Sequence, residues 1–362
     1  MIQFEPKSIA DFQEEVNGID HRYTLEKIIG NGSYGMVIKA FDSVNECYVA
    51  LKRINKEIFC EPVLALRILR EIKLLSHFRD ENIVRIRNIL TPARNDFNEF
   101  YLVMDIMETD LKKVFKSQQK LTDPHIQFFL YQCLRALKVI HDSGVIHRDI
   151  TPANILVNIN CDLKICDFGL ARESADEDQT DYVTMRWYRA PELVMEHKNY
   201  TNQVDMWGVG CILAELLGSR PMFPGKDRVN QLDKIIDIVG TPTEEELLNF
   251  GSPAAQEYVR RKEFRSASDF KDLFPDANPL AVDLLKGLLK FHPDKRMTAQ
   301  QAISHPYLAE LRDDEAESVD IHIFNHDESN LKTMNEIKAA IIQECVAFHQ
   351  KFPETNPCTS DE

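Results

Sequence analysis

Apolar residues in the first third of the chain favour short β-strands. Segments rich in Val, Ile, Tyr and Phe are separated by turn signals such as Asn31-Gly32. Strands are expected over 23–29, 36–42, 46–54, 83–90 and 100–104. One helix is expected from Glu61-Pro62 to about Phe78, because apolar residues recur there at helical spacing. The pattern predicts a small, mostly β lobe that carries one main helix.

After Glu108 the apolar residues recur at the spacing of amphipathic helices. Over 125–141 they form a wide stripe that suits a buried helix. Further helices are expected over 204–217, 228–239, 280–289 and 299–303, with a last amphipathic helix from Leu331 to Phe348. A short hairpin is expected over 156–157 and 163–165. The expected fold class is therefore α+β, with a β-rich N-lobe and a larger helical C-lobe.

Charge and composition narrow the class of protein. The 362 residues carry 43 Lys and Arg against 58 Asp and Glu, a net charge of −15. Such a surface repels nucleic acid and anionic lipid, and without a basic block neither partner is expected. The most apolar stretches are too short to cross a bilayer, and residues 1–10 do not form an export leader. The eight cysteines are dispersed without metal-site spacing, and free thiols are expected.

Two features of the first third suggest a phosphate ligand. The segment Gly30-Asn31-Gly32-Ser33-Tyr34-Gly35-Met36-Val37 lies between two expected strands, where glycines let backbone amides approach phosphate oxygens. Taken alone, it could equally be a hairpin without a ligand. Lys52 lies on the next strand and Glu71 on the expected helix. Together they suggest an ion pair that places the lysine on nucleotide phosphates.

Three more motifs follow in the helical region. In His147-Arg148-Asp149-Ile150-Thr151-Pro152-Ala153-Asn154, a carboxylate and an amide can face one site as proton acceptor and metal ligand. Asp167-Phe168-Gly169 adds a second carboxylate beside a glycine, and Ala190-Pro191-Glu192 comes later. Any one of these could be a simple turn. Their joint occurrence in this order makes a chance match negligible.

With these motifs the sequence resembles the eukaryotic protein kinases from about Tyr23 to Leu308. Thr180-Asp181-Tyr182, followed by Arg186-Trp187-Tyr188-Arg189, is similar to the activation lip of mitogen-activated protein kinases. Residues 107–111 and 161–166 are similar to the extracellular-signal-regulated branch, and the Thr-Asp-Tyr lip looks more like plant or protozoan members. The resemblance implies a bilobal kinase domain over 21–308, with an N-lobe of about 21–106 and a C-lobe of about 107–308. It also implies an N-terminal extension over 1–20, a C-terminal extension over 309–352 that wraps back to the N-lobe, and a flexible tail over 353–362.

The resemblance implies a Ser/Thr kinase that transfers the γ-phosphate of ATP, with Mg²⁺, to Ser or Thr followed by Pro. Lys52 and Glu71 would pair, Asp149 would accept the substrate proton, and Asn154 and Asp167 would hold the metal. The implied nucleotide site consists of Ile29, Gly30, Asn31, Gly32, Ser33, Tyr34, Gly35, Val37, Ala50, Lys52, Met104, Asp105, Met107, Asp110, Leu156, Cys166 and Asp167.

Regulation and partners are also implied by the resemblance. An upstream dual-specificity kinase would phosphorylate Thr180 and Tyr182, and arginines would hold the phosphates. Those arginines are Arg67, Arg148 and Arg172 for the threonine, and Arg186 and Arg189 for the tyrosine. Basic-hydrophobic docking motifs of substrates and phosphatases would bind Asp313, Asp314, Glu315, Glu317, Leu121, His125, Phe128 and Cys161. Asp205 and Arg296 match structural positions. A monomer in the cytoplasm is expected, with the nucleus as a second location.

Two departures from the family keep a second function open. Family members have Lys where this chain has Thr151, and Thr where it has Met185, so two groups that support Asp149 and the γ-phosphate are replaced. A weakly active kinase-fold scaffold that binds ATP and docking peptides is therefore the alternative. One hypothesis is that the Thr151 hydroxyl bonds Asp149 in place of the missing one. Separately, Cys166 is either a small core residue or a thiol open to alkylation at the nucleotide site.

Overall fold

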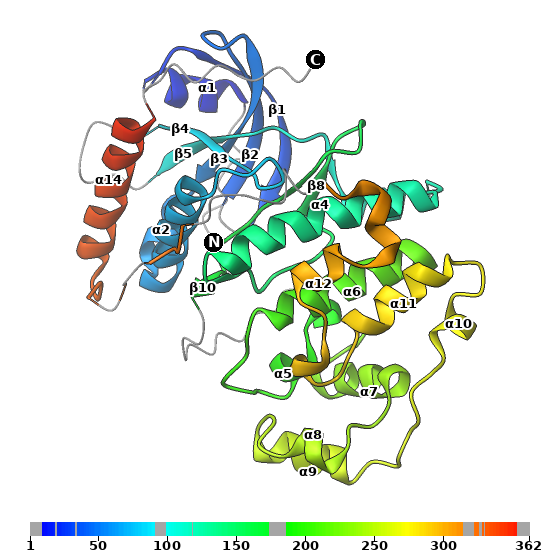
Figure 1. The fold of residues 1–362 in the computed structure, drawn as a ribbon. Coiled ribbons are helices and arrows are strands. Elements are labelled where there is room, and N and C mark those ends of the chain that lie inside the picture. Colours follow the sequence, from blue (N-terminus) through cyan, green and yellow to red (C-terminus); the bar gives the residue numbers. More distant parts are fainter. Residues whose placement is uncertain are drawn as a thin grey trace. The chain divides into compact units, whose positions relative to one another are not determined.

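The computed structural model describes residues 9–18, 20–32, 35–90, 99–117, 119–173, 186–313, 322–325, 328 and 330–352. The chain divides into two compact units. The first comprises Met1–Arg79, Ile83–Met107 and His326–Glu362, and the second Asp80–Asn82 and Glu108–Asn325. A β-sheet dominates the first unit and helices dominate the second (Figure 1), which confirms the expected α+β fold class.

The first unit contains a five-stranded antiparallel sheet in the order β1-β2-β3-β5-β4. The expected strand over 83–90 begins only at Ile86, and the β4–β5 register is irregular between Ile86 and Asn88. The elements of this unit are α1 (Ile9–Asn17), β1 (Tyr23–Gly32), β2 (Gly35–Asp42), β3 (Cys47–Ile54), η1 (Lys56–Cys60), α2 (Pro62–His77), β4 (Ile86–Leu90), β5 (Phe100–Met104) and α14 (Met334–Lys351).

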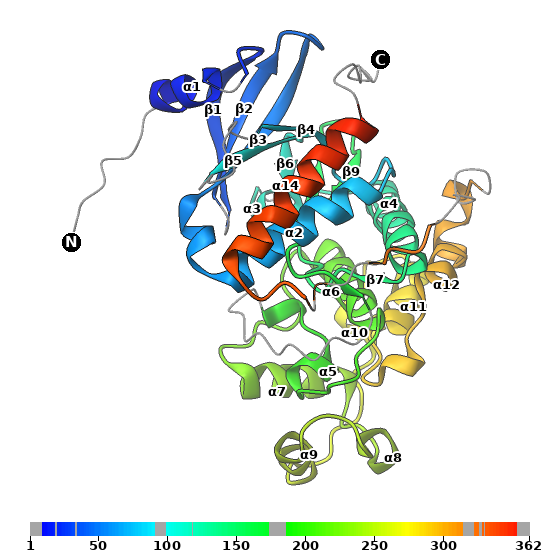
Figure 2. The same ribbon diagram turned by 90° about the vertical axis from the view of Figure 1, so that its left-hand side faces the viewer.

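Three α-helices, not one, belong to the described part of the first unit. α2 and α14 lie side by side (Figures 1 and 2), and Lys73 of α2 pairs with Glu344 of α14 at 3.8 Å. Arg70 of α2 also forms an ion pair with Glu328, just before α14. α1 packs on the sheet, so the expectation of a single helix in the small lobe is wrong where α1 is concerned.

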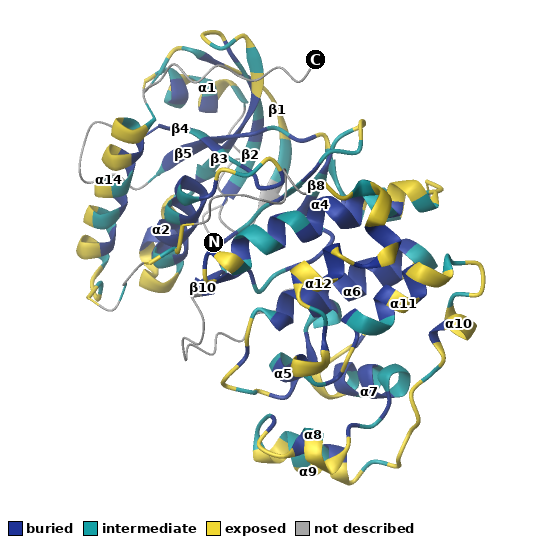
Figure 3. Ribbon diagram, in the orientation of Figure 1, coloured by how far each residue is buried: buried dark blue, intermediate teal, exposed yellow. Residues whose placement is uncertain are grey.

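The second unit is built around helix α6, which is buried almost throughout its length (Figure 3). Its elements are β6 (Thr109–Asp110), α3 (Leu111–Lys116), α4 (Asp123–Asp142), β7 (Val145–Ile146), β8 (Ile155–Val157), β9 (Leu163–Ile165), β10 (Arg172–Glu173), η2 (Arg186–Tyr188), α5 (Pro191–Val194), α6 (Gln203–Gly218), α7 (Arg228–Val239), α8 (Glu244–Leu247), α9 (Pro253–Arg260), α10 (Phe270–Leu273), α11 (Pro279–Leu288), η3 (Pro293–Lys295), α12 (Ala299–Ile303) and η4 (Pro306–Leu311). The expected helices over 228–239 and 299–303 have the predicted bounds, and the others differ by a few residues.

Two expectations from composition can be compared with the described residues. Within them, every helix is too short or too polar to span a membrane. Six of the cysteines are free thiols, namely Cys60, Cys133, Cys161, Cys166, Cys211 and Cys345. Cys47 is disulfide-bonded instead, so the expectation of free thiols is wrong at that position.

Candidate active site

In the first unit, strand β3 presents a lysine to helix α2. Lys52 Nζ lies 2.5 Å from Glu71 Oε1, and the two side chains are 12% and 1% exposed. Because a charge this well buried needs its partner, the carboxylate holds the ammonium in one place. This fixed ammonium is suited to binding the phosphates of a nucleotide.

The glycine-rich segment forms the strand-to-strand hairpin that the sequence predicts. Gly32 pairs with Gly35, and Val37 lies opposite Lys52 in the β2–β3 ladder. A Cβ atom on Gly35 would lie 1.8 Å from the Arg53 carbonyl oxygen, so only glycine fits there. Ser33 and Tyr34 lie outside the described residues. The hairpin therefore closes directly against the strand that carries Lys52.

The segment after β5 is fixed by Asp105. Its amide donates to the Arg85 carbonyl at 3.1 Å, and its carboxylate accepts from Arg87 Nε at 2.7 Å. With the amide engaged, the carbonyl oxygen is the backbone group through which Asp105 can contact adenine. Met104 and Met107 on either side are nearly buried. Ala50 lies opposite Met104 in the β3–β5 ladder, so these nucleotide-site candidates are neighbours.

In the second unit, Asn154 holds Asp149. The Asn154 side-chain amide donates to the Asp149 carbonyl at 2.9 Å and to its carboxylate at 2.7 Å. With Nδ2 used in this way, the atom of Asn154 that remains suited to a metal is Oδ1. Within the described residues no hydrogen bond joins Thr151 to Asp149, so the support for Asp149 comes from Asn154 and not from Thr151.

The same loop is anchored to α6 by Asp205. The Asp205 carboxylate accepts from the amides of His147 at 2.9 Å and Arg148 at 2.7 Å, and it contacts His141 Nε2 at 2.9 Å. Arg148 has a φ of 70°, in the left-handed region that non-glycine residues rarely adopt. A second contact comes from Gly208, whose missing Cβ would meet the Ile150 carbonyl oxygen at 2.8 Å. The loop thus rests directly on the α6 backbone.

His147 joins the loop to the segment that carries Asp167. Its Nε2 bonds the Cys166 carbonyl at 3.1 Å, and its Nδ1 accepts from the Asp149 amide at 3.3 Å. A carbonyl can only accept, so this pattern assigns the proton to Nε2. The ring also packs edge-on against Phe168. His147 therefore ties Asp149 and the Asp167 segment together.

Burial and charge act differently on the two loop carboxylates. Burial raises the pKa of Asp149, and the nearby charge of Asp167 raises it further against the opposing effects of His147 and Asn154. Burial would also raise the pKa of Asp205, but the hydrogen bond and charge of His141 and the amide of His147 hold it below the ordinary value. Asp149 is thus the better proton acceptor, while Asp205 stays ionised as an anchor.

Asn154 and Asp167 suit a hard divalent cation. They offer an amide oxygen and a carboxylate, and no group of three or more His, Cys, Asp or Glu that could hold a metal occurs in the described part of the chain. Mg²⁺ is commonly bound by one or two protein oxygens together with phosphates and water. The donor set therefore fits a metal that binds with the nucleotide. Asp167 has a φ of 64°, and its Oδ1 accepts from the Gly169 amide at 3.2 Å.

Asp110 and Leu156 lie opposite each other in the β6–β8 ladder. The Asp110 carboxylate caps α3 by accepting from the Lys113 amide at 2.8 Å, and it pairs with the Lys113 ammonium at 3.0 Å. This places both nucleotide-site candidates on one short sheet beside the loop of Asp149.

The lip residues Thr180, Tyr182 and Met185 lie outside the described residues. The candidate phosphate-binding arginines are divided between the units, with Arg67 on α2 and the rest in the second unit. Among the latter, Arg172 lies on β10 opposite Ile146, the Arg148 guanidinium packs over Tyr200, and Arg186 donates to the Lys226 carbonyl. Arg189 follows η2 directly.

The segment after the lip is firmly fixed. Trp187 Nε1 donates to the Gly225 carbonyl at 3.0 Å, and the Tyr188 hydroxyl donates to Glu215 at 2.5 Å. Farther along, Arg296 makes two hydrogen bonds of 2.6 Å to the Glu192 carboxylate, and both side chains are fully buried. These contacts give the surface next to the lip one defined shape.

Some of the docking candidates lie on and beside the start of α4. His125 contacts the Thr122 hydroxyl in a capping box, and Gln132 donates to the Cys161 carbonyl at 2.9 Å. The Asp313 amide donates to the Tyr131 hydroxyl at 3.0 Å. Phe128 is half-buried on the same helix. Asp314, Glu315 and Glu317 lie outside the described residues.

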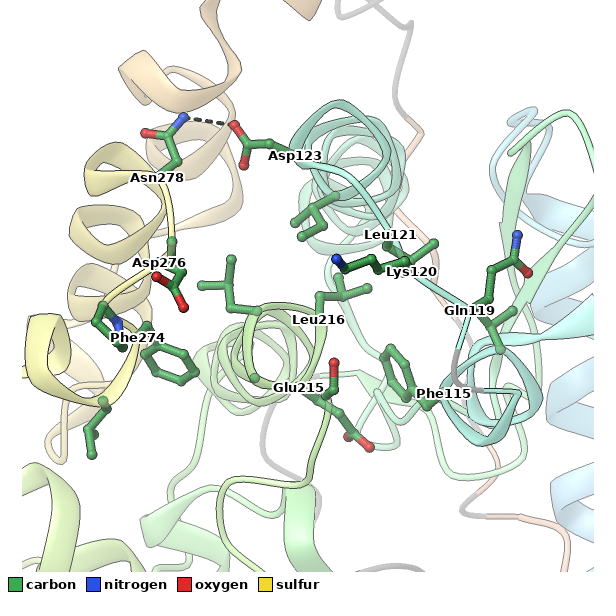
Figure 4. A pocket seen from close by; sticks show the side chains of 18 residues that line it. Phe115, Gln119, Lys120, Leu121, Asp123, Glu215, Leu216, Phe274, Asp276 and Asn278 are labelled. Atoms are coloured by element: carbon green, nitrogen blue, oxygen red, sulfur yellow. Dashed lines mark hydrogen bonds between the residues drawn. The ribbon is translucent and has the colours of Figure 1, made fainter.

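A cavity of about 600 Å³ lies in the second unit beside the start of α4 (Figure 4). Leu121 from the docking set lines it, and Lys120 and Asp276 enter from opposite sides. One wall is closed by a hydrogen bond of 2.8 Å from Asn278 to Asp123. None of the candidate nucleotide residues that the structure describes lines this cavity.

Comparisons with known proteins identify the family of the chain. A family model described as the protein kinase domain matches residues 23–308, and a protein of this class transfers phosphate from ATP to a protein hydroxyl group. The mitogen-activated protein kinase MPS1 of Pyricularia oryzae is 47% identical over 92% of this chain and 81% of its own length. The mitogen-activated protein kinases mpkB of Aspergillus fumigatus and spk1 of Schizosaccharomyces pombe are each 47% identical, over 83% and 82% of this chain and 86% and 80% of their own lengths. The chain belongs to the mitogen-activated protein kinase family.

This membership makes the chain an ATP-using Ser/Thr protein kinase that works with an upstream kinase and with protein substrates. The three relatives come from fungi. They do not test the narrower resemblance of the lip to plant or protozoan members.

Proposed function

We propose that this kinase phosphorylates Ser or Thr followed by Pro, uses Mg²⁺, and is activated by phosphorylation of Thr180 and Tyr182. The observation that carries the proposal is the geometry of one loop. Asn154 bonds the Asp149 carboxylate there, and the Asp205 carboxylate accepts from the amides of His147 and Arg148. A positioned carboxylate that accepts the hydroxyl proton, beside oxygen ligands for a metal, is what phosphoryl transfer to an alcohol requires.

Preference for proline is supported by the segment after the lip. A selective pocket needs a fixed wall, and the bonds from Trp187 to Gly225 and from Tyr188 to Glu215 supply one. Two phosphates on the preceding lip add several negative charges, which the neighbouring arginines Arg186 and Arg189 can pair. Lip phosphorylation would thereby complete the substrate surface.

We further propose that basic-hydrophobic peptides of substrates, activators and phosphatases dock at Asp313 and the start of α4. The net charge of −15 favours basic partners, and the Tyr131 hydroxyl fixes the backbone of Asp313. The kinase is proposed to act as a monomer in the cytoplasm, with the nucleus as a second location.

The test is phosphate transfer from ATP to matched Ser-Pro and Ser-Ala peptides, with the occupancy of Thr180 and Tyr182 read by mass spectrometry. Mg²⁺-dependent turnover that prefers Ser-Pro and rises with lip phosphorylation is expected. Asp149→Ala is the inactive control, and Thr180→Ala with Tyr182→Phe is the control that cannot be activated. Equal rates on both peptides, or full activity without lip phosphate, would contradict the proposal.

The replacement of two supporting groups by Thr151 and Met185 favours the scaffold as a second candidate. Loss of one preorganised donor can cost on the order of 10²–10³ in rate. Thr151→Lys with Met185→Thr should therefore raise kcat at least tenfold if these positions limit the chemistry. Fully phosphorylated protein that binds Mg-ATP and docking peptides without turnover would establish the scaffold.

A further inference from the structure

Helix α1 covers the sheet face that lies behind the nucleotide lysine. Phe12 and Val16 are 2% and 0% exposed, in one core cluster with Val49 and Leu51 of β3. Side chains alternate along a strand, so Val49, Leu51 and Arg53 point toward α1 while Lys52 points to the other face. β3 thus carries α1 on one face and the ATP-binding ammonium on the other.

A side-chain amide ties α1 to the edge strand. Gln13 Nε2 donates to the Tyr23 carbonyl at 2.9 Å, and Gln13 Oε1 accepts from the Leu25 amide at 2.6 Å. The Gln13 side-chain amide thereby donates to one backbone group of β1 and accepts from another, as the backbone of a neighbouring strand would. Because β1 leads into the glycine-rich hairpin, α1 is fixed to the root of that hairpin.

One carboxylate of α1 joins two further strands. Glu15 Oε2 accepts from the Tyr101 hydroxyl of β5 at 2.8 Å and lies 3.7 Å from Arg53 Nε of β3. Arg53 and Tyr101 are opposite partners in the β3–β5 ladder. The Arg53 guanidinium also packs over the Phe12 ring, 5.0 Å from its centre. Glu15 therefore connects the two strands one residue beyond Lys52.

Arg53 is also where the hairpin closes. Its carbonyl oxygen occupies the space in which Gly35 would carry a Cβ atom. A shift of Arg53 would thus move two parts of the ATP site together, the Lys52 ammonium and the end of the hairpin. The positions of the Lys52 ammonium and of the end of the hairpin therefore depend on β3, the strand that Glu15 contacts through Arg53.

We propose that Glu15 is a positioning residue for ATP, which acts from α1 through Arg53 and Tyr101. Glu15 contacts Tyr101 and Arg53 on the face of the sheet opposite to the one to which Lys52 points. It fixes β3 where Lys52 and the glycine-rich hairpin meet, so its effect belongs to ATP binding and not to the protein substrate.

The test compares three variants of the full chain. Glu15→Ala removes both contacts, and Glu15→Gln keeps an acceptor for Tyr101 but loses the charge that faces Arg53. Glu14→Ala is the matched control, because it removes the same charge from an exposed position on the same helix. KM for ATP, KM for the peptide, kcat and the melting temperature are measured for each.

Glu15→Ala is expected to raise KM for ATP about fivefold, the factor that corresponds to about 1 kcal/mol, while kcat at saturating ATP and KM for the peptide stay within about twofold. For Glu15→Gln, KM for ATP should lie between the values of Glu15→Ala and of the unchanged protein. For Glu14→Ala, KM for ATP should equal that of the unchanged protein. A lower melting temperature with unchanged KM for ATP would mean that Glu15 only packs the helix, and the proposal would be wrong.

A double-mutant cycle with Arg53→Met tests the route. Because Glu15 acts through Arg53 as well as Tyr101, adding Glu15→Ala to Arg53→Met should raise KM for ATP by clearly less than the fivefold expected in the unchanged protein. Fully additive effects would overturn the proposal. If Glu15→Ala does not fold, KM for ATP is measured for the milder Glu15→Gln, alone and combined with Arg53→Met. The same comparison then tests the proposal.

Discussion

Each of the two units carries its own group of candidate active-site residues, and the two groups are supported in different ways. In the second unit, the candidate catalytic residues Asp149 and Asn154 lie five residues apart and bond each other, and one buried carboxylate, Asp205, anchors their loop. In the first unit, Lys52 and Glu71 come from separate elements, and the strand of Lys52 is backed by a helix from outside the kinase match. The chemical half is thus self-contained, whereas the ATP half depends on a flanking segment.

The largest expected effect is on the chemical half. Asp149→Ala removes the proton acceptor, so kcat should fall by about 10²–10⁴ while affinity for Mg-ATP changes little. Steady-state kinetics with nucleotide titration measures both. If ATP affinity were lost together with kcat, Asp149 would belong to the binding half and the division between the units would fail.

The anchor of the loop should show its effect in stability. Asp205→Asn leaves His141 beside a neutral group in a buried site, and we expect it to lower the free energy of unfolding by about 3 kcal/mol, measured by denaturant titration at pH 7. Asp283→Asn is the matched control, because this carboxylate also pairs with a histidine, His305, but is 70% exposed.

Comparing the unchanged protein with Asp205→Asn at different pH values gives a second test of the anchor. The folded pKa of Asp205 lies below its ordinary value of 3.8, so the stability that its ionised form contributes is present above pH 3.8 and is lost as the pH falls through the folded pKa. The difference between the unchanged protein and Asp205→Asn should therefore shrink in acid. A constant difference would point to a purely steric effect.

The ATP half should respond more mildly to a single change. Glu71→Gln removes the charge that holds Lys52, and KM for ATP is expected to rise about tenfold with a smaller change in kcat, because the ammonium remains but is less well placed. Glu61→Gln, exposed at the start of the same helix, serves as the control. A fall in kcat alone would mean that the pair acts on the chemical step.

The smallest expected effect is that bound Mg-ATP protects Cys166 from alkylation. Cys166 is partly exposed beside Asp167, so an electrophile should alkylate it more slowly when Mg-ATP is bound, as measured by mass spectrometry. Cys60 is exposed and should react equally with or without nucleotide. Burial raises the pKa of Cys133 to about 12, so this thiol should stay unmodified. Equal labelling of Cys166 in both conditions would make it a packing residue only.

Much of the fold could be predicted because its elements have strong local patterns. Helix α7 has the bounds that its apolar spacing indicates, and the Asp149 loop follows from a compact motif. Strand β4 was expected to begin at Ile83, since a run of apolar residues cannot distinguish a strand from a buried irregular segment. Ile83 and Val84 are indeed buried, but outside the strand.

Helix α1 shows what a single sequence does not reveal. Ile9, Phe12 and Val16 have helical spacing, but nine residues are too few to form a stable helix alone. Its stability comes from contacts with strands far along the chain, such as that between Glu15 and Tyr101. The roles of Gln13 and Glu15 therefore depend on tertiary structure, and no motif points to them.

The close approach of Gly208 to the Ile150 carbonyl limits which residue this position accepts. A single methyl group at this buried point of α6 would push on the loop of Asp149 from below. Gly208 has no chemistry of its own, yet any side chain at this position would meet the backbone and side chain of Ile150. We therefore expect only glycine to be compatible with this contact between α6 and the loop of Asp149.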